Sequence, residues 1–308
     1  MRKEALSCRC TCTTAANKPV STKQAQNDML IKTGNASDFW QPDHPHTEFL
    51  RSVPQWCGHP SREVEFCAIP KNLRTQLTYL FCREALPHLH SFNVNNRLNP
   101  WLSLHRFLFP VCLQRFYSFR STRPNRFVVL RHPVERLVSA WQHLCTSHTV
   151  LGYTWTQQLC LHCPTTDLCC FIRRLYQLAR HPATAKLHST TTTQLLAWHF
   201  LPQSYHCNLA THKHKFTEID FSDKTGLIEF LRKMGVSNSS LDAGWGANGQ
   251  LPFLRQPTLH AATKDGKSKK NEAIELLRRD KFHLALLKSL YHTDYALFSS
   301  RTQSEWAF

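Results

Sequence analysis

Long apolar runs are missing from this sequence. No stretch of the 308 residues approaches the roughly 18 to 20 apolar residues that a membrane-spanning helix needs. The first residues, Met1 to Val20, are polar and rich in cysteine, which is not typical of a signal peptide. If the protein reaches a membrane, we therefore expect an anchor that this sequence does not show.

Acidic residues are also scarce, and the known nucleic-acid-binding motifs are absent. The chain has 38 lysines and arginines against 21 aspartates and glutamates, a formal net charge of +17 before any of the 19 histidines is protonated. Such a field attracts polyanions, whether nucleic acids, anionic membranes, nucleotides or sulfated and carboxylated polysaccharides. Because there is no zinc-finger spacing, no basic region leading into heptads and no RNP-like aromatic pattern, we expect no nucleic-acid partner.

Cysteine, by contrast, is abundant. Thirteen cysteines are scattered along the chain, which favours an oxidising compartment and several disulfides. Cys160 and Cys163, followed by Cys169 and Cys170, also suggest zinc, but no second pair stands at the spacing of zinc ligands. We therefore expect disulfides and no bound metal, with the connectivity open. The glycosylation sequons, compatible with a glycoprotein, are Asn35-Ala36-Ser37 and Asn238-Ser239-Ser240.

The length is sufficient for one large domain preceded by a less regular segment. Residues 1–62 are rich in threonine, asparagine, glutamine, proline and histidine without a sustained period, which predicts an extended or poorly ordered lead-in. We expect the folded domain at residues 63–300 and a short tail at 301–308.

Two strand, loop and helix units stand in this domain. Val64 to Ile69 is a short apolar run with β character, and apolar residues at helical spacing follow from Thr75 to Leu86. Arg126 to Leu130 is a second such run, and the helix after it has Pro133 in its first turn, where the missing amide hydrogen has no helical partner to lose. Repeated units of this kind predict an α/β fold, a parallel sheet flanked by helices with ligand at the carboxyl ends of the strands.

Further helices are predicted over Leu168 to Arg180, Thr190 to Trp198, Lys224 to Met234 and Asn271 to Leu290. The last of these is expected to be one long amphipathic helix. The lysine-rich stretch Thr263 to Lys270 precedes it and is either a basic flap that closes over a nucleotide or a solvated linker.

The first loop, Ile69 to Thr75, places a lysine and a hydroxyl residue at the start of a helix. Unpaired backbone amides and the helix dipole favour a phosphate or sulfate there. Lys71 would neutralise charge on the bridging oxygen as the donor bond breaks. The loop lacks the glycines of a Walker A motif, and a lysine beside a helix start is more often a solvated surface group.

The second loop carries a sharper pattern. Arg131 stands at the end of a strand, and Arg136 and Ser139 lie on the following helix. Arg131 offers a planar fork and Ser139 a hydroxyl donor, so the two can converge on one phosphate. For Arg136, an ion pair with a nearby carboxylate that fixes the helix is an equally good explanation.

The run Arg-His-Pro-x-x-Arg-x-x-Ser from Arg131 to Ser139 resembles the 3′-phosphate-binding motif of the Golgi carbohydrate sulfotransferases, the chondroitin and HNK-1 sulfotransferases of sulfotransferase family 2. Three more segments follow the order of that family. Pro70 to Thr75 is similar to its 5′-phosphosulfate loop, and His199 to Gln203 with Cys207 is similar to its His-(Trp/Phe)-x-Pro segment and later cysteine. Tyr291 to Phe298 is similar to its Tyr-x-x-Asp-Tyr-x-Leu-Phe ending. The resemblance extends from about Val64 to Phe298.

The resemblance implies a P-loop-like sulfotransferase fold and a carbohydrate sulfotransferase of the Golgi lumen or membrane. Such an enzyme moves a sulfuryl group from 3′-phosphoadenosine 5′-phosphosulfate (PAPS) to a glycan hydroxyl without a metal. Lys71 would serve in both catalysis and binding, and the implied donor-binding residues are Lys71, Asn72, Leu73, Arg74, Thr75, Arg131 and Ser139. Two positions depart from the family: Arg74 stands where many relatives carry a small residue, and His132 replaces the commoner aspartate.

Sulfuryl transfer also needs a base for the proton of the acceptor hydroxyl. His199 is the candidate, because it lies in a family-like segment and an imidazole titrates near neutrality. Glu218 and His105 are alternatives, and many histidines in proteins have no catalytic duty.

The net charge of +17 favours an anionic acceptor, such as a chondroitin-like glycosaminoglycan. Two other functions stay open. A relative that binds glycans or nucleotides but has lost turnover, for instance through Arg74, would bind donor without transfer. A basic nucleic-acid-binding protein would show salt-sensitive binding to single strands or duplexes.

Overall fold

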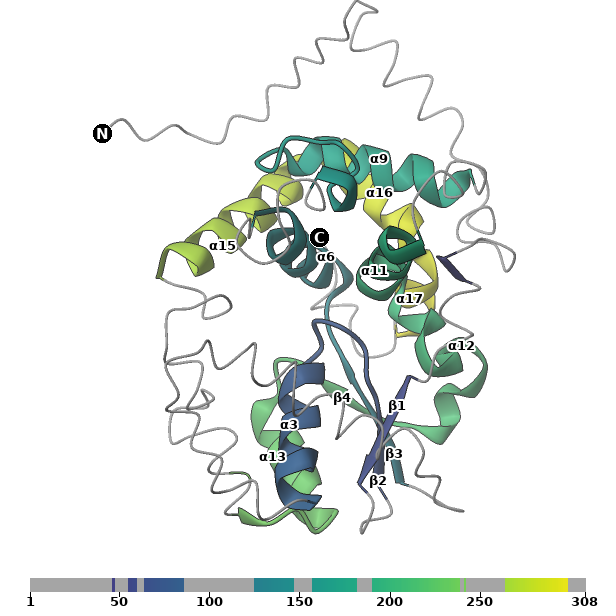
Figure 1. Ribbon diagram of the computed structural model, residues 1–308, viewed down its shortest axis with the longest axis vertical. Coiled ribbons are helices and arrows are strands. Elements are labelled where there is room, and N and C mark those ends of the chain that lie inside the picture. The colour runs from purple at the N-terminus through teal and green to yellow at the C-terminus, as the bar shows by residue number, and fades with distance from the viewer. Residues whose placement is uncertain are drawn as a thin grey trace, which may run out of the picture. The chain divides into compact units, whose positions relative to one another are not determined.

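The computed structural model describes residues 46–47, 55–59, 64–85, 125–146, 157–181, 190–238, 241 and 264–298. The chain divides into two compact units (Figure 1). The first comprises residues 1–49, 137–202 and 269–308, and the second comprises residues 50–136 and 203–268. The expectation of a single domain at 63–300 stays a prediction.

The second unit is built on a four-stranded sheet in the order β1-β2-β3-β4. The strands are β1 (Trp56–His59), β2 (Val64–Cys67), β3 (Asn125–Leu130) and β4 (Thr217–Asp220). β2, β3 and β4 are parallel, and β1 joins the edge of β2 in the antiparallel direction. The predicted α/β fold with parallel strands is confirmed, and the antiparallel edge strand is an addition to it.

β1 lies inside the stretch 1–62, which the sequence predicts as extended or poorly ordered. Its register pairs Trp56 with Cys67 and His59 with Val64, so the sheet begins before residue 63. A strand of four residues is too short to show a hydrophobic period, and its partner strand supplies the hydrogen bonds that hold it.

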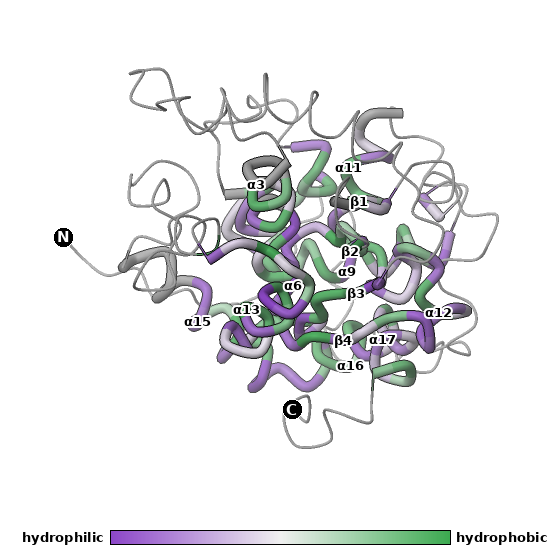
Figure 2. Tube along the Cα trace, turned by 90° about the horizontal axis from the view of Figure 1, so that it is seen from below, coloured by the Kyte–Doolittle hydropathy of each residue, from purple (hydrophilic) through white to green (hydrophobic). Residues whose placement is uncertain are grey.

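Aromatic side chains fill the core of this unit. Phe66 of β2 and Phe127 of β3 are buried and pack on Phe81, with ring centroids 5.3 and 6.4 Å from the Phe81 ring. Phe81 comes from α3 (Arg74–Ala85), and Phe230, 5.1 Å from Phe127, comes from α13 (Lys224–Lys233). Hydropathy changes from hydrophilic to hydrophobic along β3 as it enters this core (Figure 2). Each large side chain buried here stabilises the fold by about 1.5 to 3 kcal/mol.

Three connections leave the carboxyl ends of the parallel strands at one edge of the sheet. Residues 68–73 lead from β2 to α3, Arg131 and His132 lead from β3 to α6 (Pro133–Trp141), and residues 221–223 lead from β4 to α13. Asp223 caps α13 by accepting a hydrogen bond from the amide of Gly226 at 2.8 Å. The expected ligand-binding edge is therefore formed by three loops.

The first unit is helical in its described part. It contains the later turns of α6, continued by a π-helical turn at Gln142–Thr146, and α9 (Leu168–Arg180), α11 (Thr190–Phe200), α16 (Lys281–Leu290) and α17 (His292–Leu297). α9 packs against α16, and the Tyr291 hydroxyl donates to the carbonyl oxygen of Phe200 at 2.9 Å. Three predicted helices, at 168–180, 190–198 and 224–234, are found within two residues of the expected bounds.

The single helix predicted over Asn271 to Leu290 is wrong. The chain forms α15 (Lys264–Arg279) and α16, separated at Asp280. The Asp280 carboxylate accepts a hydrogen bond from the amide of His283 at 3.2 Å and so caps a new helix. The stretch 264–270, expected to be a flap or linker, is the beginning of α15, and the side chains of 264–269 lie outside the described residues.

Three disulfides are present in the described residues, which confirms the expected oxidised cysteines and supplies their pairing. Cys67 pairs with Cys207 in the second unit, and Cys145–Cys160 and Cys163–Cys170 lie in the first. Within the same ranges, no helix is both long enough and apolar enough to cross a bilayer.

Cys169 lies outside these disulfides, near Asp280 and His283. Sulfur, carboxylate and imidazole atoms of the three residues come within 4.8 Å of one another. The His283 ring and the Asp280 carboxylate are hydrogen bonded at 2.6 Å, and Asp280 already caps α16. The helix cap therefore accounts for this cluster, and the absence of a metal stays a prediction.

Candidate functional site

The loop between β2 and α3 has an unusual backbone. Lys71 (φ 70°) and Leu73 (φ 63°) both adopt the left-handed conformation, although neither is a glycine. This conformation costs roughly 1 to 2 kcal/mol for each such residue, so the surrounding contacts must hold it. The loop therefore adopts backbone angles that are typical of glycine, although it lacks the glycines of a Walker A motif.

Two buried arginines from the second loop supply those contacts. The Nε atom of Arg136 donates to the Pro70 carbonyl at 3.2 Å, and Nη1 of Arg131 donates to the Lys71 carbonyl at 3.0 Å. Because N–H and C=O point in opposite directions across a trans peptide, the amide of Lys71 faces away from Arg136. α3 begins three residues later, where the first-turn amides have no partner within the helix. The loop thus offers backbone donors to an anion.

Buried hydrogen bonds of Asn72 and Gln203 connect the two loops. Asn72 is buried and its side-chain amide donates to the Val129 carbonyl at 2.8 Å and to Oε1 of Gln203. Gln203 also accepts from the Arg131 amide at 3.0 Å and donates to the Arg131 carbonyl at 2.7 Å. Its side chain therefore pairs with Arg131 as a neighbouring strand would.

Replacing Gln203 with methionine should lower the free energy of unfolding by about 1 to 3 kcal/mol, because buried main-chain groups of Arg131 lose their partners. Thermal and urea unfolding measure the change. Gln177→Met, at an exposed position of α9, is the matched control and should change stability by less than about 0.5 kcal/mol. Equal stability of the two variants would show that the Gln203 bridge carries no net free energy.

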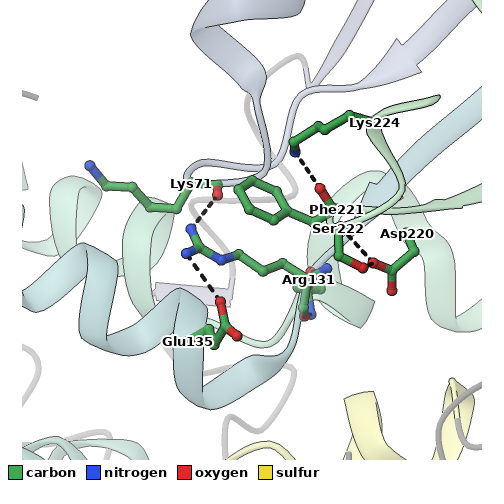
Figure 3. A network of polar contacts seen from close by, with 8 residues as sticks. Lys71, Arg131, Glu135, Asp220, Phe221, Ser222 and Lys224 are labelled. Atoms are coloured by element: carbon green, nitrogen blue, oxygen red, sulfur yellow. Dashed lines mark hydrogen bonds and ion pairs between the residues drawn. The ribbon is translucent and has the colours of Figure 1, made fainter. Parts of the chain in front are cut away.

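The Arg131 guanidinium is buried but not fully satisfied. Its Nη2 lies 3.4 Å from Oε2 of Glu135, and its Cζ lies 4.2 Å from the centre of the Phe221 ring (Figure 3). Its Nε is buried and has no hydrogen-bond partner among the residues that the structure describes. A buried donor on a cation that lacks a hydrogen-bond partner would be satisfied by an anionic oxygen.

Lys71 extends away from Arg131, beyond the carbonyl that Arg131 binds (Figure 3). No hydrogen bond or ion pair between described residues reaches its ammonium group. Burial, together with the positive charges of Arg131 and Arg136, lowers the pKa of Lys71 to about 7. A bound anion would reverse this effect by favouring the charged form.

This edge of the sheet therefore combines a lysine, a buried arginine with a spare donor and a helix start, all suited to a phosphate or sulfate. The sequence matches the model of the sulfotransferase family over residues 59–299. The chain belongs to the sulfotransferase family. Comparison with curated proteins and with solved structures yields no match. Membership confirms the family inferred from the sequence motifs, and it makes sulfuryl transfer the general class of reaction.

In this sulfotransferase, the other predicted donor-binding residues of the first loop differ in their surroundings. Leu73 packs partly against the hydrophobic core, and Arg74 is the half-buried first residue of α3. Thr75 is the second residue of that helix, and its side chain lies outside the description. Asn72 turns its side chain inward, so the structure gives it an anchoring role.

Two predicted residues belong to the other unit of the sulfotransferase. Ser139 is half-buried on α6, and His199 is half-buried in the last turn of α11, its ring 5.9 Å from that of His143. Their roles stay predictions. Of the alternative bases, Glu218 on β4 is 3.4 Å from the ammonium of Lys213, and His105 lies outside the described residues.

Sequence reasoning did not assign a role to several residues of this site. Gln203 stood inside a family-like segment without a role, and Lys224 follows β4 where only a helix was expected. Arg136, for which an ion pair with a carboxylate was one of two explanations, contacts the Pro70 carbonyl and lies 3.5 Å from the His206 ring. The signal that could have found Lys224 is the third strand-to-helix connection, since parallel strands end at one edge.

Proposed function

We propose that this sulfotransferase takes the sulfuryl group from PAPS and transfers it to the hydroxyl of a glycan. The observation that carries the proposal is the pairing of Arg131 with the Lys71 loop at the carboxyl ends of β2 and β3. Arg131 and Ser139 are assigned to the 3′-phosphate, and the loop from Lys71 to Thr75 is assigned to the 5′-phosphosulfate.

In the reaction, a bond forms between the acceptor oxygen and sulfur, and the bond from sulfur to the bridging oxygen of the donor breaks. The electron pair of the broken bond stays on the leaving phosphate, where the Lys71 ammonium and the loop amides stabilise it. The acceptor proton passes to a base, which we assign to His199. No step calls for a metal ion.

The acceptor is proposed to be an anionic polysaccharide of the chondroitin type. A net charge of +17 concentrates such chains near the protein. The three disulfides of the described residues agree with the oxidising lumen of the secretory route, so we assign the enzyme to the Golgi, in the lumen or at the membrane.

Purified protein should transfer radiolabelled sulfate from PAPS to unsulfated chondroitin. A heparan precursor and a neutral glycan of similar length are tested alongside it, and labelled product is digested to disaccharides to locate the sulfate. Transfer to the neutral glycan alone would contradict the anionic acceptor. Binding of donor without transfer to any glycan would indicate a relative that has lost turnover.

A further inference from the structure

The third loop of the donor-binding edge carries a cation that neither the motifs nor the family match assigns. β4 runs parallel to β3, and the amide of Phe221 donates to the Leu130 carbonyl at 2.7 Å. This bond continues the pairing of the two strands to the residue before Arg131. Phe221 and, three residues later, Lys224 are therefore fixed beside the second loop.

Arg131 and Lys224 contact the same aromatic ring. The Cζ atom of Arg131 lies 4.2 Å from the centre of the Phe221 ring, and Nζ of Lys224 lies 3.6 Å from it. The two side chains approach from opposite sides (Figure 3), and the Lys224 ammonium donates to the Phe221 carbonyl. The ring attracts both cations through its electron-rich faces.

The charges around Arg131 and Lys224 do not balance. The cations are Lys71, Arg131, Arg136 and Lys224, and the carboxylates are Glu135 and Asp220. When all six groups are ionised, four positive and two negative charges give them a net charge of +2. Asp220 is also engaged, because one of its oxygens accepts hydrogen bonds from the amide of Ser222 at 2.6 Å and from the Ser222 hydroxyl.

The pKa of Lys224 reflects this excess of positive charge. Burial and the charge of Arg131 lower its pKa to about 8, and Asp220 opposes the change with a smaller effect. A phosphate monoester carries close to two negative charges at neutral pH, which equals the excess of the cluster. One ammonium hydrogen is held by the Phe221 carbonyl, and an ammonium has three to donate.

We propose that Lys224 is a further donor-binding residue, which acts with Arg131 to select nucleotides that carry a 3′-phosphate. This inference rests on the proposed function, because it names a specificity determinant of the same donor site. Arg131 supplies the directional fork, and Lys224 supplies the second positive charge that a dianionic phosphate needs. A 5′-monophosphate lacks the group that Lys224 recognises.

Calorimetric titration of the full chain with adenosine 3′,5′-bisphosphate and with adenosine 5′-phosphate tests the inference, the weaker ligand being measured by competition. Lys224→Met should weaken binding of the bisphosphate roughly 5- to 50-fold and of the monophosphate less than about twofold. Lys224→Arg, which keeps the charge, should recover most of the lost affinity. Lys233→Met, at an exposed position of α13, is the matched control and should leave both affinities unchanged.

Two results would overturn the Lys224 assignment while the proposed function stands: unchanged binding of the bisphosphate by Lys224→Met, or an equal loss for both nucleotides, which is the sign of a structural role. If folded wild-type protein binds no bisphosphate at all, the proposed function itself fails, and the Lys224 assignment fails with it. Thermal unfolding of every variant shows that the protein titrated is folded.

Discussion

Replacing Lys71 with methionine should lower kcat for sulfuryl transfer about 100- to 1,000-fold, the loss typical of removing one group that stabilises charge on a leaving oxygen. Among the described residues no partner holds the Lys71 ammonium, so the substitution breaks no hydrogen bond or ion pair within this part of the structure. kcat is measured with saturating PAPS and the glycan acceptor. Lys215→Met, at an exposed position, is the matched control.

The role of Lys71 can also be tested by the pH dependence with which the product nucleotide, adenosine 3′,5′-bisphosphate, binds. The pKa of Lys71 is about 7 before an anion binds, and a neighbouring phosphate raises it, so binding above pH 7 requires uptake of a proton. Affinity for adenosine 3′,5′-bisphosphate should therefore fall as pH rises from about 7.5 to 9, where the phosphates, with a second pKa near 6, are already ionised.

The Lys71→Met variant should show a shallower fall over this range. Lys224, with a pKa of about 8, contributes the remaining dependence. A kcat within tenfold of wild type, together with an unchanged pH profile, would contradict the catalytic role of Lys71.

The meeting of Lys71 and Arg131 could be predicted from the sequence because it follows from topology. Each residue stands directly after an apolar β run, and parallel strands present their carboxyl ends at one edge. The order of the elements therefore predicts that the two loops lie together, and no knowledge of side-chain contacts is needed. The same argument applied to Thr217–Asp220 would have added Lys224, but that strand is short and only partly buried, so it gives a weak signal.

The contacts that shape the loops could not be predicted, because they join residues far apart in the chain. Gln203 reaches Arg131 across 72 positions, and Cys67 is joined to Cys207 across 140. The left-handed backbone of Lys71 contradicts local preference and is held by tertiary hydrogen bonds. At Asp280 a local contact decides the structure, since the helix cap interrupts an apolar pattern that favours one continuous helix.

Replacing Arg131 with methionine should weaken binding of adenosine 3′,5′-bisphosphate about 10- to 150-fold, the equivalent of losing a charge-assisted hydrogen bond of roughly 1.5 to 3 kcal/mol. The loss has two sources. The buried Nε donor no longer meets the phosphate, and the Lys71 carbonyl loses the partner that holds its loop. Calorimetric titration at fixed salt measures the change.

Two comparisons distinguish the loss of the directional contacts of Arg131 from a general loss of positive charge. Arg131→Lys keeps the charge but not the planar fork, so its affinity should lie between wild type and Arg131→Met. Arg126→Met removes an arginine from the start of the same strand, where it pairs with Glu65 at 3.1 Å and lies over Trp56, and should bind the nucleotide normally. If Arg126→Met weakens binding as much as Arg131→Met, the effect belongs to the overall field of the protein. Selective loss at Arg131 would instead mean that the carboxyl end of β3 is where the nucleotide phosphate binds.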